Sequence, residues 1–324
     1  MNKTIKNIMI GAGIVAGTVT TAGVISYKIT KKLVGIALDR KEETTIDSPE
    51  RKRPETSEMK AFIKMREEAA HKLEQSSCET VNIIARDGVN LVGHWQKGKN
   101  VKRIIIAVHG WRSSWTKDFG LIADFLHENN CHVLYIEQRG QNNSGGKYMG
   151  FGLTERYDCL DWIDWVNQKE PEKLPIYLCG ISMGASTVLM TAGFDLLQEV
   201  HGVIADCGYT SPHAIWKHVA EEELHLRYDE VMSSIAEDIC KSKIQIGPKD
   251  YSCTDAMEKC KVPVLFVHGT DDDFVPVEMT YENYKACVAP KRLLVVPGAG
   301  HGMSYIVEKE KYEETLRKFW NEFD

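Results

Sequence analysis

The chain has 324 residues, 43% of them hydrophobic and 27% charged, which is enough apolar sequence to bury a large core. A formal net charge of −6 gives no reason to expect nucleic acid as a partner. The nine cysteines include no C-x-x-C pair, so the sequence predicts neither a zinc site nor an obvious disulfide framework.

The N-terminal segment differs from the rest of the chain. No charged residue occurs from Asn7 to Tyr27, and lysines flank this run on both sides. A helix of that length crosses the hydrocarbon core of a bilayer, so the run predicts a single-pass membrane anchor within residues 1–32. Gly13 and Gly17 form a G-x-x-x-G pattern of the kind that pairs such helices. A cleaved signal peptide and a buried core helix remain as alternatives.

The side of the membrane stays open. Lys28, Lys31 and Lys32 follow the uncharged run and favour a cytoplasmic location for the rest of the chain, but large domains behind such a segment are often exported. Residues 33–60 are rich in charge and contain two prolines, which predicts a solvated linker. The remaining residues, 61–324, form the predicted main domain.

Apolar runs alternate with helix-like stretches from residue 81 onward. Two runs around the turn at 86–88 predict a hairpin, and six later runs have the continuous apolar character of buried strands. These six runs span residues 103–108, 132–137, 175–181, 202–207, 262–269 and 292–298. The alternation predicts an α/β fold with a mostly parallel sheet and helices on both faces. Residues 208–261 are too long for a simple crossover, so we expect a helical cap there.

Residue types that acyl transfer requires follow three of these runs, in the chain order serine, aspartate, histidine. Ser182 lies in the G-x-S-x-G stretch 180–184, where glycines permit a sharp strand-to-helix turn. Asp272 and His301 follow the runs 262–269 and 292–298. A serine hydroxyl needs a base to take its proton, and an imidazole serves when a carboxylate orients it. We therefore expect a Ser182–Asp272–His301 triad at the carboxyl edge of the sheet.

An oxyanion hole requires backbone N–H donors and no particular side chain. Met183 follows Ser182 at the start of a helix, and Trp111 lies in the loop after the run 103–108, so these two residues are the predicted donors. This chemistry needs no cofactor and no metal. Because residues 1–40 contain none of these groups, we expect the catalytic domain to remain active without them.

From about residue 80 to its end the chain resembles an α/β-hydrolase, and in particular the bacterial, often N-terminally anchored serine hydrolases of that superfamily. The resemblance rests on HGW (109–111), GFGLTERYDCLDWI (150–163), GISMGAS (180–186), DCGYTS (206–211), HGTDDDFVP (268–276) and GAGHG (298–302). It implies ester hydrolysis through an acyl-enzyme, and the family pattern G-x-x-D-x-x-V-P assigns the triad acid to Asp272. The chain departs from the family pattern D-x-R-G-x-G-x-S, because Glu137 and Asn142 replace its first Asp and second Gly. This departure concerns a loop near the acyl pocket and leaves the chemistry unchanged.

Other residues near these motifs have structural interpretations. Asp206 is the second candidate for the triad acid, although we expect it to hold the turn into the cap, and Asp271 and Asp273 adjoin Asp272. We expect structural roles for His109, His268 and Arg139, whereas Trp111, Trp115 and Trp216 fit either an acyl pocket or the core.

Three functions are compatible with this sequence. The leading hypothesis is a membrane-anchored serine hydrolase that acts on small-molecule carboxylic esters. A peptidase or amidase would use the same triad, because the cap and not the triad selects the leaving group. A non-catalytic binding protein on a hydrolase scaffold is the third hypothesis, but such a protein would usually have lost Ser182 or His301, and both are present.

Overall fold

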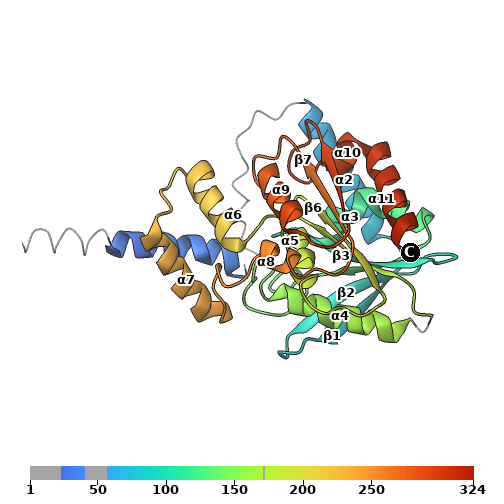
Figure 1. Ribbon diagram of the computed structural model, residues 1–324, viewed down its shortest axis with the longest axis horizontal. Helices are drawn as coiled ribbons and strands as arrows, with labels where there is room; N and C mark the ends of the chain where they lie inside the picture. The colour runs from blue at the N-terminus through green and yellow to red at the C-terminus, as the bar shows by residue number, and fades with distance from the viewer. Residues whose placement is uncertain (1–22, 41–56, 171) are drawn as a thin grey trace, which may run out of the picture.

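The computed structural model describes residues 23–40, 57–170 and 172–324 of the chain (Figure 1). Within these ranges eight strands form one sheet in the order β1-β2-β4-β3-β5-β6-β7-β8. The strands are β1 (Cys78–Ile84), β2 (Asn90–Gln96), β3 (Arg103–Val108), β4 (Cys131–Ile136), β5 (Ile176–Ile181), β6 (Val200–Asp206), β7 (Val264–Gly269) and β8 (Lys291–Val296). The helices are α2 (Ser57–Glu74), α3 (Trp115–Glu128), α4 (Glu155–Lys169), α5 (Met183–Thr191), α6 (Pro212–His218), the π-helix η1 (Val219–Glu223), α7 (Glu230–Ile244), α8 (Cys253–Met257), α9 (Val277–Ala286), α10 (Ser304–Val307) and α11 (Lys309–Phe323).

The predicted mostly parallel α/β sheet is confirmed. Strand β2 pairs antiparallel with β1 and with β4, whereas the pairs from β4 through β3, β5, β6 and β7 to β8 are parallel. Every residue of β3 and of β7 is buried, as the continuous apolar runs predict for strands covered on both faces. All parallel strands therefore end at one edge of the sheet, where their following loops meet.

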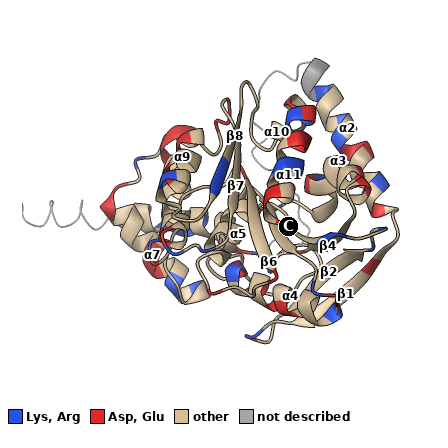
Figure 2. Cartoon of the chain, turned by 45° about the vertical axis from the view of Figure 1, so that its right-hand side comes forward, with Lys and Arg blue, Asp and Glu red and all other residues tan. Residues whose placement is uncertain are grey.

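Two apolar layers cover the two faces of the sheet. One layer packs side chains of α4, α5 and α8 against the strands, with Trp162 and Leu189 fully buried. The other packs side chains of α3 and α11, including Phe119 and Trp320, against the opposite face. Figure 2 shows that acidic and basic residues lie mainly on the outer helices, while the strands β6 and β7 carry few charges. Because both faces of the sheet are covered by apolar side chains, polar side chains next to the core are expected at the ends of the strands.

A third apolar cluster lies outside these two layers. Helices α6, η1 and α7, inserted between β6 and β7, stand beside the sheet (Figure 1) and lie in the interval 208–261, where the sequence predicts a helical cap; these three helices are called the cap below. Helix α8 belongs to the same interval but packs on α5 in the main core. The cap cluster also contains Val34 and Leu38 from a helix that covers residues 23–38. The cap cluster therefore combines two segments that are far apart in the sequence.

The structure changes the prediction for the N-terminal segment. Residues 33–38 belong to a helix rather than to the predicted linker, and the rest of that linker, 41–56, lies outside the described residues. The predicted membrane run also lies outside them up to residue 22. In the described part of the chain, no helix combines the length and apolarity needed to cross a membrane. Since Val34 and Leu38 are buried in the cap cluster, the described residues 23–40 pack against the rest of the chain instead of standing apart from it.

Candidate active site

Ser182 occupies a strained turn between β5 and α5. Its backbone has φ 56° and ψ −119°, a conformation that a residue with a Cβ rarely adopts. A Cβ on Gly180 would lie 2.2 Å from the Gly184 carbonyl oxygen, and one on Gly184 would lie 1.9 Å from the Val108 oxygen. Both flanking positions therefore require glycine. The tight turn explains the G-x-S-x-G spacing and projects the serine from the end of the strand.

The structure brings Ser182, His301 and Asp272 together in a hydrogen-bonded chain. Ser182 Oγ lies 2.9 Å from His301 Nε2, and His301 Nδ1 lies 2.8 Å from Asp272 Oδ2. The three residues come from loops after β5, β7 and β8, as their positions after the apolar runs predict. If Nδ1 donates its proton to the carboxylate, Nε2 is free to accept the proton of the serine hydroxyl.

Asp272 is held ionised by four donors. The backbone N–H groups of Phe274 and Val275 donate to Oδ1, at 3.0 and 2.9 Å, while His268 and His301 both contact Oδ2. Burial alone would raise the pKa of this carboxyl, but the hydrogen bonds from His268 and His301 outweigh it and hold the pKa well below its ordinary value. A permanent negative charge beside Nδ1 favours the tautomer that leaves Nε2 unprotonated.

His268 holds the loop after β7 by hydrogen bonds, as expected, and one of these bonds goes to Asp272 itself. Its Nε2 lies 3.1 Å from Asp272 Oδ2 and 2.8 Å from the Val275 carbonyl, both acceptors, so Nε2 carries the proton. Its Nδ1 lies 2.6 Å from Thr280 Oγ1 on α9. The side chain thus fixes the acid loop from within β7. The only sequence signal for the bond between His268 and Asp272 was their spacing of four residues.

The carboxylates of the aspartate run have different partners in the structure. Asp272 contacts His301, whereas Asp271 accepts a hydrogen bond from Thr270 Oγ1. The earlier candidate Asp206 accepts from Ser304 Oγ and Tyr312 OH, which lie on α10 and α11. Asp206 therefore joins β6 to the C-terminal helices. The sequence instead suggested that it holds the turn into the cap.

The loop after β3 lies directly against Ser182. A Cβ on Gly110 would be 3.3 Å from Ser182 Cβ, so the next residue, Trp111, begins beside Ser182. Asp118 on α3 holds this loop, since its carboxylate accepts from Gly110 N at 2.7 Å and from Ser113 Oγ at 2.6 Å. The N–H groups of Trp111 and of Met183, the first residue of α5, are thus carried by the two backbone segments that flank Ser182.

Aromatic side chains line the cap side of the triad. Phe151 lies 6.1 Å from Trp111, 6.1 Å from Tyr209 and 5.4 Å from Trp216, measured between ring centroids. Phe274 packs edge-on against the His301 ring at 5.1 Å. The same apolar cluster contains Met183. Trp115, by contrast, stacks on His94 in the main core and lines no acyl pocket.

One group of side chains near the triad has the composition of a metal site. In the described ranges, Cys207, Asp272 and His301 have their potential ligand atoms within 4.8 Å of one another. Asp272 and His301 already bond to each other, and burial raises the pKa of the Cys207 thiol, which keeps it protonated and a poor ligand. We therefore interpret Cys207 as a packing residue beneath the triad.

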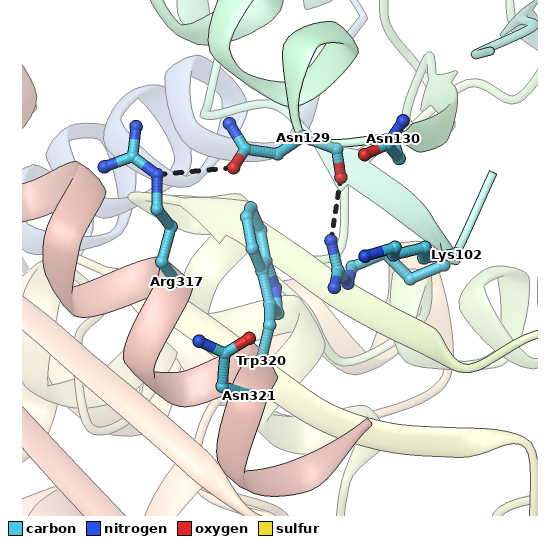
Figure 3. Close-up of a pocket in the computed structure, with 7 residues that line it drawn as sticks. Lys102, Asn129, Asn130, Arg317, Trp320 and Asn321 are labelled. Atoms are coloured by element: carbon cyan, nitrogen blue, oxygen red, sulfur yellow. Dashed lines mark hydrogen bonds between the residues drawn. The ribbon is translucent and has the colours of Figure 1, made fainter. Parts of the chain in front are cut away.

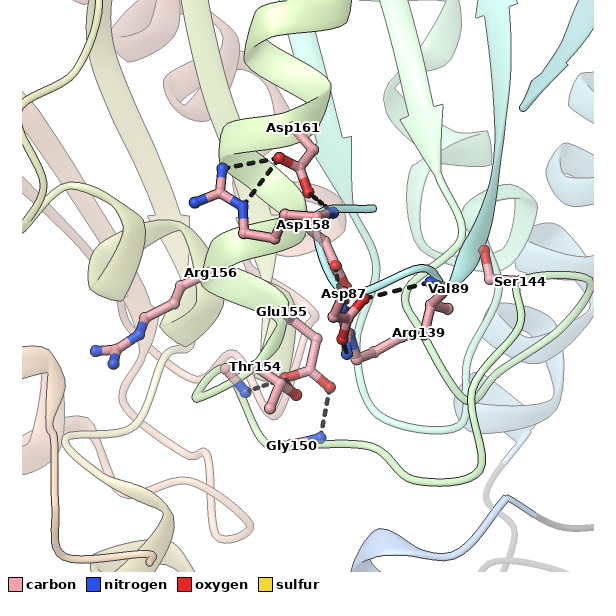
Figure 4. Close-up of polar contacts among 12 residues, drawn as sticks. Asp87, Val89, Arg139, Ser144, Gly150, Thr154, Glu155, Arg156, Asp158 and Asp161 are labelled. Carbon is pink, nitrogen blue, oxygen red and sulfur yellow. Dashed lines mark hydrogen bonds and ion pairs between the residues drawn. The ribbon is translucent and has the colours of Figure 1, made fainter. Parts of the chain in front are cut away.

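The residues expected to be structural hold the neighbouring loops. His109 Nδ1 donates to the Gly110 carbonyl and Nε2 accepts from Gln138 N, and burial lowers its pKa. Arg139 bonds to Asp158 and to Asp87, as Figure 4 shows, so it anchors its loop and is not a substrate ligand.

The loop that departs from the family pattern is stabilised internally. Glu137 accepts from the backbone and side chain of Asn143, and its other contact is His94 Nε2 at 2.8 Å. Asn142 adopts φ 47° and donates to the Ser113 carbonyl at 3.0 Å. Asn142 therefore connects this loop to the loop that carries Trp111, whereas Glu137 holds the loop from within and joins it to His94 on β2.

The opposite edge of the sheet has a small polar pocket of about 130 Å³ (Figure 3). Arg103, the first residue of β3, donates there to the Asn129 carbonyl, and the Arg317 guanidinium donates to the Asn129 side chain. Lys102, Asn130, Trp320 and Asn321 complete the lining. These donors and acceptors bond to one another, and the lining contains no nucleophile with a neighbouring base, so we assign no chemistry to this pocket.

Comparison with known proteins places this geometry in context. The model of a family described as serine aminopeptidase, S33, matches residues 99–237. The chain is 27% identical over 235 residues to the uncharacterized protein YqkD of Bacillus subtilis, covering 72% of this chain and 75% of that one. It is 31% identical over 202 residues to the uncharacterized protein Rv2307c of Mycobacterium tuberculosis, covering 62% and 64%.

Solved structures with a similar fold include an esterase and an acylaminoacyl peptidase. The esterase Pf2001 of Pyrococcus furiosus has a TM-score of 0.64 and 23% identity, over 78% of this chain and 93% of that chain. Est1E of Butyrivibrio proteoclasticus, solved with ferulic acid, has a TM-score of 0.60 and 21% identity, over 75% and 98%. An acylaminoacyl peptidase of Pyrococcus horikoshii has a TM-score of 0.58 and 16% identity, over 78% and 43%. At these identities the likeness concerns the fold alone.

Proposed function

Because the chain belongs to the α/β-hydrolase superfamily, we propose that it is a serine hydrolase that cleaves carboxylic esters through an acyl-enzyme. One observation carries the proposal: the unbroken hydrogen-bonded chain from Ser182 Oγ through His301 to Asp272. A nucleophile, a base and an orienting carboxylate are the parts that this chemistry requires. The strained backbone at Ser182 supports the same role, since such strain is typical of functional residues.

The reaction follows from these contacts. Ser182 Oγ attacks the ester carbonyl carbon while His301 Nε2 takes the hydroxyl proton, and Asp272 stabilises the imidazolium that results. His301 then gives the proton to the departing alcohol, which leaves an acyl group on Ser182. Water attacks that acyl group by the same route, and its proton passes through His301 to regenerate the serine. We assign the negative oxygen of each tetrahedral intermediate to the backbone N–H groups of Trp111 and Met183.

The apolar surroundings favour an ester with an apolar acyl group. Phe151, Trp216 and Phe274 bring aromatic surface close to the triad, and Met183 lies in the same cluster. Removal of apolar surface from water stabilises a bound acyl chain by about 25 cal/mol per Å². Amide cleavage is the second candidate, because the matching family model describes a serine aminopeptidase. An aminopeptidase must bind a free amino group, whereas the cap cluster is made of apolar side chains.

Two assays of the full-length protein in detergent test this proposal. A fluorophosphonate probe should label wild-type protein at Ser182, and p-nitrophenyl esters should be hydrolysed faster than aminoacyl p-nitroanilides. A series of acyl chains from acetate to palmitate would then define the preferred length. Faster cleavage of the anilides would favour the peptidase, and absence of both labelling and hydrolysis would favour a binding protein.

We further propose that the N-terminal segment attaches the protein to a membrane. The uncharged run from Asn7 to Tyr27 supports this location, and so do the exposed apolar side chains of Val24 and Ile25 at its end. Full-length protein should sediment with membranes and resist a carbonate wash. Unprocessed protein in the soluble fraction would contradict the anchor, and a mature chain beginning near Gly23 would indicate a cleaved signal.

A further inference from the structure

The C-terminal end of the helix at residues 23–38 is completed by residues of the candidate active site. A helix leaves its last four carbonyls without partners inside the helix, so other groups must satisfy them. In this helix the donors are Asp39 N to Gly35 O (2.9 Å), Arg112 Nη2 to Ile36 O (2.7 Å), Trp111 Nε1 to Ala37 O (3.0 Å) and Met149 N to Leu38 O (2.7 Å). Two of these four donors belong to the loop that carries a predicted oxyanion donor.

Further contacts bind the same end of the helix to the loop. Arg112 Nη2 also donates to the Asp39 carbonyl at 2.9 Å, and its positive charge lies at the helix end where the macrodipole is negative. The Arg112 guanidinium stands over the Trp111 ring, 5.0 Å from its centroid. The helix end and the side chains of Trp111 and Arg112 therefore order each other. The carbonyls accept hydrogen bonds from these two side chains, and the side chains would lose their acceptors without the helix.

Residues just after the helix connect the loop following β4 and the cap. Arg40 N donates to the Lys147 carbonyl at 2.9 Å, and Arg40 Nη2 donates to the Asn142 carbonyl at 2.7 Å. The Asp39 carboxylate pairs with Lys243 of α7 at 2.6 Å. One short segment thus joins the loops after β3 and β4 to the cap.

Buried side chains hold this segment in place. Leu38 has no exposed surface and Val34 is 3% exposed, and both pack in the cluster that contains Met183 and Phe151. Leu38 lies in the sequence between Ala37, whose carbonyl bonds to Trp111, and Asp39 and Arg40. The burial of Leu38 therefore fixes the positions of these three neighbouring residues. Leu38 lies far from Ser182, Asp272 and His301 in the sequence, and no motif marks it.

We propose that residues 36–40 position the oxyanion-hole loop and hold the cap over the triad, so that this N-terminal segment is part of the catalytic site. The inference rests on the proposed serine hydrolase function. Its physical basis is geometric: the Trp111 N–H stabilises an oxyanion only at hydrogen-bond distance, and a displacement of about 1 Å lowers turnover by about 10²-fold. Leu38 and Arg112 are positioning residues in this arrangement, acting through Trp111.

The test uses Leu38→Ala, Arg112→Ala and the double variant in the full-length protein. Each single change should lower kcat on an ester substrate by about 10-fold to about 100-fold with a smaller change in KM, because the loop acts on the transition state. The double variant should lose little more than the worse single variant, since both changes release the same loop. Leu38→Met should restore most of the activity by refilling the site.

A matched control separates positioning from general destabilisation. Leu316 on α11 is buried to 2% exposure in the opposite apolar layer, so Leu316→Ala removes a comparable side chain far from the loop. Its kcat should stay near the wild-type value in protein that remains folded by circular dichroism. Trp111→Phe, which keeps an aromatic ring and removes the Nε1 donor to Ala37 O, provides a second variant if Leu38→Ala fails to fold.

The outcomes distinguish this inference from the proposed function. Wild-type kcat in Leu38→Ala, Arg112→Ala and Trp111→Phe, with Ser182 still labelled by the fluorophosphonate probe, would overturn the positioning role alone. Additive losses in the double variant would show that the two residues act independently, and would also overturn it. Absence of labelling in the wild-type protein would instead contradict the serine hydrolase itself.

Discussion

The carboxyl edge of the sheet and the N-terminal segment contribute to the same candidate site in different ways. Ser182, Asp272 and His301 each follow a strand, so the pairing of the strands brings them together. Residues 34–40 follow no strand and contain no nucleophile or base beside the triad, yet they bond to the loop at Trp111 and Arg112. Reactive groups thus come from local motifs, whereas their support comes from a distant part of the chain.

The largest expected effect concerns Ser182 at the carboxyl edge of the sheet. Ser182→Ala should lower turnover on the order of 10⁶-fold and abolish probe labelling, because it removes the hydroxyl that contacts His301 and would carry the acyl group. The fold should persist, since the change removes only a hydroxyl, and circular dichroism would check this. Labelling at the wild-type level would place the nucleophile elsewhere and break the comparison.

The second prediction concerns the orienting carboxylate. Asp272→Asn should lower kcat on the order of 10⁴-fold, because the amide no longer favours the required tautomer of His301. Asp271→Asn serves as the matched control, since its carboxylate contacts Thr270 and not the triad, and should cost far less. A greater loss in Asp273→Asn than in Asp272→Asn would refute the assignment of the acid.

The third prediction measures how firmly the main domain holds the oxyanion loop. Asp118→Ala removes the acceptor for Gly110 N and Ser113 Oγ, so the loop should shift and kcat should fall by about 10-fold to about 100-fold. Asp124→Ala on the same helix removes an exposed partner of Lys72 and should leave kcat unchanged. If Asp118→Ala were harmless while Leu38→Ala was damaging, the N-terminal segment alone would hold the loop.

The smallest expected effect is a change in stability with pH. The pKa of Asp272 is lower in the folded protein than in the unfolded chain, so its contribution is complete above the ordinary value near 3.9 and is lost as the pH falls below it. Asp272→Asn should therefore be less stable than wild type near pH 6, and the difference should shrink towards about pH 3. Chemical denaturation at several pH values measures this difference. A constant difference would contradict the lowered pKa.

Much of the sheet could be predicted because its signals are local. The apolar run 103–108 coincides with β3, and the run 175–181 differs from β5 by one residue at its start. Strands buried on both faces have continuous apolar sequence, and such runs are visible without any knowledge of their partners. The turn at Ser182 was equally visible, because only glycine fits at the two flanking positions.

The contacts that support Ser182, Asp272 and His301 could not be predicted, because their signals are not local. His268 was expected only to hold a loop, yet it donates to the triad acid, and Asp206 bonds to C-terminal helices instead of the cap. These roles depend on which groups face each other across the folded chain. A histidine or aspartate at the end of an apolar run has the same local sequence in either role.

By itself, the sequence determined the strand order along the chain, the turn that exposes Ser182 and the positions of Asp272 and His301 after their strands. These features follow from apolar periodicity and from backbone sterics, which act over a few residues. Only the tertiary structure decided that residues 34–40 complete the site. Their hydrogen bonds to Trp111 and Arg112 join residues more than 70 positions apart, and contacts at that separation arise from packing, which leaves no repeating pattern in the sequence.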